Sequence, residues 1–145
     1  MYSHRVGSSP RRSAATAIVS AVLFAGGVVL AVEPRKMLSG DQEVPAVKTL
    51  ASASSKITVT SGMAVIGTLK TSRIEGTMAH IHQGAAGANG PVVVTLTNAT
   101  PNTWSVPTGT RLTVAQYASF QRGEMYVNVH SAAHPAGEIR LQLIP

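Results

Sequence analysis

The feature that most constrains the fold is a strict alternation of apolar and polar residues near the C-terminus. In residues 124–130, every second side chain from Met125 to Val129 is apolar, and the side chains between them carry polar groups. Residues 138–143 repeat this alternation. Successive side chains of a strand point to opposite faces, so each segment predicts a strand with one face in a core. The short loop between them predicts an antiparallel pair.

Further segments of the chain are rich in β-branched and apolar residues and are separated by glycine and proline. We expect strands in residues 56–60, 62–71, 74–82 and 91–98. Short strands at intervals of roughly ten residues are typical of sandwiches and barrels. The sequence therefore predicts an all-β fold, built as an antiparallel β-sandwich or barrel.

One segment breaks the strand pattern and predicts a short helix over about residues 113–122. Thr113 is a candidate N-cap, and Gln116 follows three residues later, which is the spacing of a capping box. Gly123 is a natural stop at the C-terminal end of this helix. We expect the helix to lie across a sheet edge or at one end of the barrel.

The N-terminal segment has the composition of a targeting sequence. Residues 1–13 carry three arginines and no acidic residue, and residues 14–32 carry no charge. A basic start followed by an apolar run predicts a secretory signal peptide over residues 1–32, joined by a linker at 33–36 to a domain over 37–145. The apolar run is close to the shortest membrane span, about 17 residues, so an uncleaved N-terminal membrane anchor is the alternative. In either case we expect export to the periplasm or the extracellular space.

Part of the positive charge of the chain comes from this leader. The full chain has a net charge of +6, but without the three leader arginines nine basic residues remain against six acidic ones. These basic residues are scattered and do not interleave with aromatic residues, which gives no support to nucleic-acid binding. The chain has no cysteine, so thiolate metal sites and cysteine nucleophiles are excluded.

The histidines outside the leader fall into two pairs, and each pair has a spacing that can chelate a metal. His80 and His82 flank Ile81, and on a strand they share one face while Ile81 points to the other. At a rise of about 3.3 Å per residue, the two side chains start roughly 7 Å apart at Cβ and can converge on one ion. We expect Ile81 in the core and both histidines on the outer face of the sheet.

The second pair lies at the end of the last strands. Pro135 disfavours a helical conformation for His134, so we expect His130 on a strand and His134 in the following loop. Parity places His130 on the face opposite Val127 and Val129, which is again the outer face. The predicted metal ligands are therefore His80, His82, His130 and His134.

A group of imidazoles without thiolate or carboxylate favours copper, with zinc as the alternative. Met78 shares the parity of His80 and is a candidate thioether ligand, but we expect it to fill the core, as we expect for Met63 and Met125. Glu138 lies near the second pair, where we expect a solvated carboxylate, with orientation of a metal ligand as the alternative.

Three segments of the chain resemble the CHRD domain, a family named after chordin and common in exported bacterial proteins. They are "LSGDQEVPAV" (38–47), "AHIHQGAAGANGPVVVTL" (79–96) and residues 112–143, in which "YVNVHSAAHPAGEIR" is the most specific part. The resemblance covers nearly the whole expected domain and implies a Greek-key β-barrel or sandwich similar to copper–zinc superoxide dismutase. In that dismutase family an H-x-H pair and a late-strand histidine hold copper. The pair resembles His80 and His82, the late ligand resembles His130, and His134 would complete a four-histidine site.

Departures from the dismutase pattern limit what the resemblance carries over. The chain has no cysteine for a disulfide, and no histidine outside the leader is left for a zinc subsite. Arg140 is the nearest candidate for a positive guide to an anion, and its parity does not settle whether it reaches the metal. We therefore expect an exported domain that binds or handles metal in the cell envelope. The alternatives are a copper-only superoxide dismutase-like enzyme and a metal-free structural or adhesive module.

Overall fold

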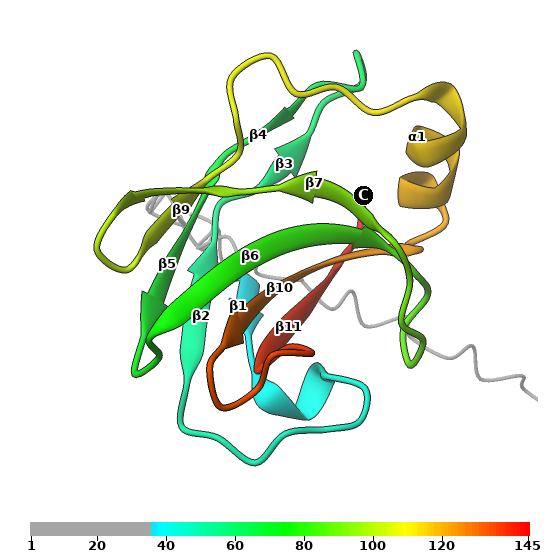
Figure 1. The fold of residues 1–145 in the computed structure, drawn as a ribbon. Coiled ribbons are helices and arrows are strands. Elements are labelled where there is room, and N and C mark those ends of the chain that lie inside the picture. Colours follow the sequence, from blue (N-terminus) through cyan, green and yellow to red (C-terminus); the bar gives the residue numbers. More distant parts are fainter. Residues whose placement is uncertain (1–35) are drawn as a thin grey trace, which may run out of the picture. The chain divides into compact units, whose positions relative to one another are not determined.

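The computed structural model describes residues 36–145, which form a β-rich domain (Figure 1). The predicted leader at residues 1–32 and all of the linker except Lys36 lie outside the described residues. In the described part of the chain, no helix is long and apolar enough to cross a membrane.

Most strands of residues 36–145 belong to two antiparallel sheets. The five-stranded sheet has the order β1 (Lys36–Leu38), β2 (Ser52–Ser55), β5 (Thr68–Ser72), β9 (Thr103–Ser105) and β8 (Thr97–Thr100). The four-stranded sheet has the order β11 (Ile139–Leu143), β10 (Met125–Ser131), β6 (Gly76–Gln83) and β7 (Val92–Thr95). A small ribbon pairs β3 (Thr58–Val59) with β4 (Val65–Ile66). The prediction of an antiparallel all-β fold is confirmed, while a Greek-key connection and a likeness to superoxide dismutase stay predictions.

The two sheets meet along one edge. The backbone N–H of Ser39, just after β1, donates to the carbonyl of Arg140 on β11 at 3.1 Å, and the N–H of Arg140 donates back at 3.0 Å. Figure 1 shows β1 and β11 side by side at this junction. This pair of hydrogen bonds fixes β11 relative to the five-stranded sheet, and with it the neighbouring strands β10 and β6.

The core lies between the sheets and follows the alternation seen in the sequence. On β10, Met125, Val127 and Val129 are buried in the core, and Ile81 of β6 joins them. The opposing sheet contributes Leu38, Ala53, Leu69 and Trp104. Burial of each large apolar side chain contributes about 1.5–3 kcal/mol. A slip of one residue would turn these side chains toward solvent, so packing fixes the register of β6 and β10.

The predicted helix is present as α1 (Val114–Gln121). Its N-cap, Thr113, accepts a hydrogen bond from the backbone N–H of Gln116, and the Gln116 side chain accepts one from the backbone N–H of Thr113. Both halves of the predicted capping box are therefore formed. Gly123 follows the helix at a φ of 70°, which glycine adopts without strain, and ends the helix where the sequence predicted.

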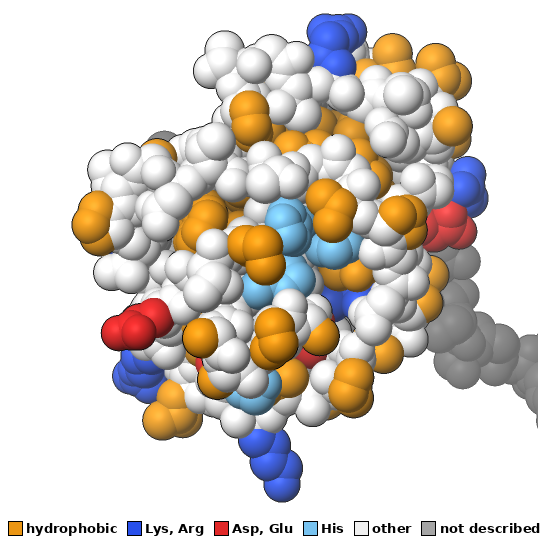
Figure 2. Space-filling model, viewed as in Figure 1, with side chains coloured by type: hydrophobic (Ala, Val, Ile, Leu, Met, Phe, Trp, Pro, Cys, Tyr) orange, Lys and Arg blue, Asp and Glu red, His pale blue; other side chains and the backbone are white. Residues whose placement is uncertain are grey.

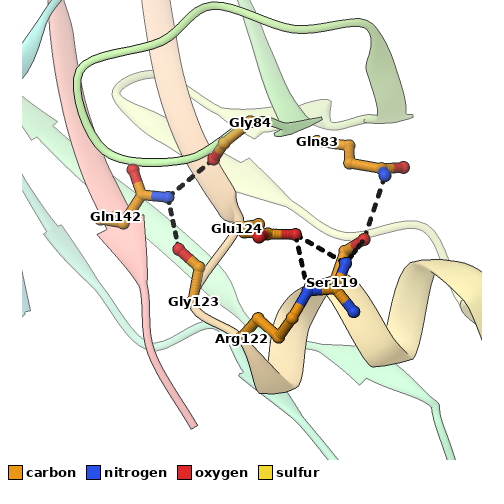
Figure 3. A network of polar contacts seen from close by, with 7 residues as sticks. All are labelled: Gln83, Gly84, Ser119, Arg122, Gly123, Glu124 and Gln142. Carbon is orange, nitrogen blue, oxygen red and sulfur yellow. Dashed lines mark hydrogen bonds and ion pairs between the residues drawn. The ribbon is translucent and has the colours of Figure 1, made fainter.

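Side-chain hydrogen bonds join α1 to the end of the four-stranded sheet (Figure 3). The hydroxyl of Ser119 on α1 accepts from Gln83 Nε2 at the end of β6, at 3.0 Å. The side-chain amide of Gln142 on β11 donates at 2.8 Å to the carbonyls of both Gly84 and Gly123. These contacts fix the ends of the strands that carry the histidines.

Loops cover the face of the four-stranded sheet opposite the core, on which we expected the histidines. All seven residues of β10 are buried. The loop at 84–91 is held over this face because the Arg140 guanidinium donates to Asn89 Oδ1 at 3.3 Å. Asn89 in turn donates to the carbonyl of Val44 at 2.7 Å, which ties down the segment after the 3-10 helix η1 (Gly40–Gln42). Loops therefore enclose the polar face and create a partly buried polar site.

Candidate metal centre

Two neighbouring strands bring three of the predicted ligands together. On β6, Ile81 is buried in the core, and His80 and His82 point to the opposite face, as parity predicts. The pairing of β6 with β10 places Asn128 opposite His80, and His130 follows two residues later on the same face. Diagonal neighbours on one face of a sheet lie within reach of long side chains, so the three imidazoles can meet.

The imidazoles of His80, His82 and His130 form a compact group. One ligand nitrogen from each lies within 4.8 Å of the other two. Nδ1 of His80 is 3.0 Å from Nε2 of His130. Figure 2 shows histidine side chains gathered on this face, with apolar side chains around them. Metal–imidazole bonds are about 2.0–2.1 Å long, so small ring rotations bring all three nitrogens to one ion.

His82 presents a buried nitrogen with a free lone pair. Its Nδ1 lies 2.9 Å from the carbonyl oxygen of Gly90, which only accepts, so Nδ1 of the neutral ring carries the proton. Nε2 is buried and forms no hydrogen bond of ordinary geometry among residues 36–145, although the side chain of Asn128, whose Oδ1 is also unpaired, lies beside His82. A buried polar atom without a partner costs about 1–3 kcal/mol. Coordination of a metal ion would satisfy this nitrogen.

The tautomer of His130 is fixed in the same way. Its Nδ1 lies 2.9 Å from the carbonyl oxygen of Pro135, so Nδ1 carries the proton and Nε2 holds the lone pair. Nδ1 of His80 then donates its proton to Nε2 of His130 in the hydrogen bond between the rings. An ion bound between these two nitrogens would replace this hydrogen bond, and the proton of the neutral His80 ring would then be carried on its Nε2.

The surroundings favour the neutral form of two of these imidazoles. Burial lowers the pKa of His80, and the neighbouring His130 and His82 lower it further. Burial also lowers the pKa of His82, against the opposing effect of its hydrogen bond to the Gly90 carbonyl. Because a metal binds the deprotonated ring, a lowered pKa widens the pH range in which these nitrogens are available.

Tyr126 contacts both a ligand and a buried cation. Its ring lies parallel to that of His82, with an interplanar angle of 1° and centroids 4.7 Å apart. Cζ of Arg140 lies 3.4 Å from the Tyr126 centroid. Arg140 is only 1% exposed and also donates to Asn89 and to the Ala85 carbonyl. Its guanidinium therefore holds the covering loop and the Tyr126 ring in place, rather than standing exposed as a guide for anions.

Glu43 is a buried carboxylate close to this polar face that the sequence patterns did not indicate. It is 6% exposed, and within the described domain its Oε1 has no hydrogen-bond partner. Burial raises the pKa of Glu43, and the positive charge of Arg140 opposes this. The segment "GDQEVP" at 40–45, part of the family resemblance, was the available signal for this residue.

His134, the fourth predicted ligand, is not a member of the group that the described residues form. It lies in the turn after β10, where its backbone N–H donates to the carbonyl and to the hydroxyl of Ser131, both at 3.2 Å. This turn brings the carbonyl of Pro135, and not the imidazole of His134, to His130. The site assembled by the described residues therefore has three histidines.

Glu138 is buried, contrary to the expectation of a solvated carboxylate. It accepts hydrogen bonds from the hydroxyls of Thr49, at 2.6 Å, and Ser131. Burial disfavours the ionised form, but these two hydrogen bonds hold the pKa of Glu138 below its usual value. Glu138 therefore ties the loop after β10 to the segment around Thr49.

Met78 differs from the expectation that it fills the core, because it is 45% exposed. Met125 is 1% exposed and lies in the core, and Met63 packs against the core, as predicted for both. Met78 lies opposite His130 in the pairing of β6 with β10. An exposed methionine therefore lies across from His130 on the neighbouring strand.

Comparison with known families gives a match to the described domain. The CHRD domain family model matches residues 35–143, a segment that includes every strand and helix described above. No curated protein and no solved structure matches the chain. Since the matched segment covers most of its length, the chain belongs to the CHRD domain family.

Proposed function

We propose that this CHRD domain binds a single copper ion through Nδ1 of His80 and the Nε2 atoms of His82 and His130. The observation that carries the proposal is the buried Nε2 of His82, which has a fixed tautomer and lacks a hydrogen-bond partner in the described part of the chain. One ligand nitrogen from each of His80, His82 and His130 lies within 4.8 Å of the other two. A metal ion is the partner that satisfies all three nitrogens together.

The donor set favours copper over other divalent metals. The group consists of imidazoles alone, and the chain has no cysteine. Imidazole suits both copper and zinc, and a given nitrogen site binds Cu(II) more tightly than Zn(II). Structural zinc sites more often use cysteine ligands, so zinc is the alternative guest.

We place this binding outside the cytoplasm, as a metal-binding or metal-handling function of the cell envelope. The support is the basic and then apolar composition of residues 1–32, which is typical of a secretory leader. His80 is only partly buried, whereas His82 and His130 are buried. An ion held by one accessible and two buried ligands could be passed to or from a partner without unfolding the domain.

Metal binding, rather than superoxide dismutation, is the function that the geometry supports best. Arg140 was the candidate for a positive guide in the sequence, and its guanidinium is buried against Tyr126. A dismutation assay on copper-loaded protein addresses the enzymatic alternative. A rate above that of the same concentration of free copper would favour the enzyme.

Titration of the metal-free protein with Cu(II), Cu(I) and Zn(II) tests the proposal. We expect saturable binding of a single ion, with copper bound more tightly than zinc. Replacement of His80, His82 or His130 by alanine should weaken binding, while His134→Ala is the matched control that should retain it. If the folded wild-type domain shows no saturable copper or zinc binding, the proposal fails and a metal-free structural module remains.

A further inference from the structure

We infer that Met78 supplies a thioether ligand when the ion in the three-histidine site is Cu(I). The assignment rests on the proposed function, because it concerns the same site. It adds a fourth ligand and a preference for the reduced form of the metal.

Strand geometry places Met78 on the face that carries the imidazoles. Met78 precedes His80 by two residues on β6, and Ala79 between them is fully buried in the core. Residues two apart on a strand share a face. Met78 also pairs directly with His130 across the sheet. Directly opposed side chains start about 4.5–5.5 Å apart at Cβ, which is within reach of a ligand shared with His130.

The strand pairing is irregular next to Met78. The register between β6 and β10 shifts after His130, so that Ser131 pairs with Gly76 and Thr77 is passed over. Such a bulge bends the strand and re-aims side chains, and bulges are frequent beside functional sites. Here the bulge ends the regular pairing of β6 with β10 beside His130. Met78 lies at this end of the histidine group and is exposed.

Core packing does not account for Met78. The side chain is 45% exposed, whereas Met125 on the opposite face of the sheet is 1% exposed. A methionine side chain is unbranched and flexible, so its sulfur can move onto an ion without a change of the backbone. Met78 therefore has the position and the side-chain freedom that a ligand needs. Its side chain is not fixed in another position by packing in the core.

The chemistry of the sulfur makes the inference specific for one oxidation state. A thioether is a soft, uncharged ligand that selects Cu(I), whereas imidazole also binds Cu(II) and Zn(II). Cu(I) also carries less charge than Cu(II) or Zn(II). Burying a charge is costly, and the partly buried histidine group contains no anionic ligand to offset it, so this cost is lower for Cu(I). Cu(I) affinity should thus depend on Met78, and Cu(II) and Zn(II) affinity should not.

The test compares Met78→Leu with Met37→Leu. Met37 is the matched control, because it is 43% exposed but lies on β1 in the other sheet. Loss of a partner outside the ligand shell commonly weakens metal binding by about tenfold to a hundredfold, so loss of a ligand should cost at least about tenfold. We expect Met78→Leu to lose this much Cu(I) affinity in competition with a Cu(I) chelator and to keep its Cu(II) affinity. Met37→Leu should keep both.

X-ray absorption of the Cu(I)-loaded protein gives a readout that a purely structural role would not change. The wild-type spectrum should contain a sulfur scatterer that disappears in Met78→Leu. A spectrum with nitrogen ligands alone, or equal Cu(I) affinity in the two proteins, would overturn the inference and leave the three-histidine site intact. Wild-type protein that binds neither form of copper would instead overturn the proposed function, and the inference with it.

Discussion

The imidazole of His82 lies face to face with the ring of Tyr126, with centroids 4.7 Å apart and planes within 1°. The same imidazole is held at Nδ1 by the carbonyl of Gly90, and the Gly90 N–H donates to the Tyr126 hydroxyl at 3.3 Å. One aromatic residue and one loop residue therefore fix both the plane and the tautomer of a candidate ligand. Metal affinity should depend on such residues although they do not touch the ion.

Replacing Tyr126 by leucine should weaken copper binding by about tenfold to a hundredfold, because the plane that orients His82 is lost. Tyr126→Phe separates the effect of the ring from that of the hydroxyl, since it keeps the stacked plane and removes only the acceptor of the Gly90 N–H. Calorimetric titration of both variants measures the effect, at a temperature at which circular dichroism shows them folded. Wild-type affinity in Tyr126→Leu would mean that stacking does not position the ligand.

Gly90→Ala should weaken copper binding and lower the melting temperature. A Cβ at this position would overlap the carbonyl oxygen of Gln83, so the Gly90 carbonyl that orients His82 has to shift. Gly87→Ala in the same loop is the control, because a Cβ there meets nothing within 4 Å and its φ of 78° adds only strain of about 1–2 kcal/mol. Thermal unfolding and copper titration should separate the two. Equal affinity in both variants would contradict the role given to the Gly90 carbonyl.

Ile81 and His82 are adjacent and lie on opposite faces, so substitutions there should separate folding from metal binding. Ile81 is 1% exposed, and Ile81→Ala should lower the free energy of unfolding by about 2–5 kcal/mol. Ile81→Asp should abolish folding, because it places an unpaired charge in the core. His82→Ala should leave a folded domain that binds copper weakly. Chemical denaturation measures the stabilities, and equal destabilisation by Ile81→Ala and His82→Ala would contradict the assigned faces.

Local patterns in the sequence predicted the elements and the facing of their side chains. Alternation in residues 124–130 predicted β10 and its core residues Met125, Val127 and Val129, since the period of a strand is set by its backbone alone. The capping box at Thr113 predicted the start of α1 for the same reason, because every contact in it is local.

Features that depend on long-range contacts escaped the sequence analysis. The loop at 84–91 covers the histidine face through Arg140, which lies far along the chain, and no local pattern indicates this. The turn after His130 decides that a carbonyl of Pro135, and not His134, meets the imidazole. The exposure of Met78, by contrast, follows from the strand parity that it shares with His80, which places it on the face opposite the core.

The lowered pKa values of His80 and His82 predict that the metal-free domain loses stability in acid. Unfolded histidine has a pKa of about 6.5, so near this pH the unfolded chain binds more protons than the folded one. The stabilisation is fully present above about pH 6.5 and is lost as the pH falls through the lowered folded values. Melting temperatures from about pH 8 to pH 5 should fall on acidification, and less so in the double variant His80→Ala, His82→Ala. An equally steep fall in the double variant would assign the acid sensitivity to other groups.

The central claim is that three imidazoles share one ion, and anomalous diffraction from crystals of the copper-loaded domain tests it most directly. We expect a single strong peak at the copper absorption edge, within about 2.0–2.2 Å of Nδ1 of His80 and of Nε2 of both His82 and His130. A peak bound elsewhere on the domain, or no peak between these nitrogens at saturating copper, would contradict the account.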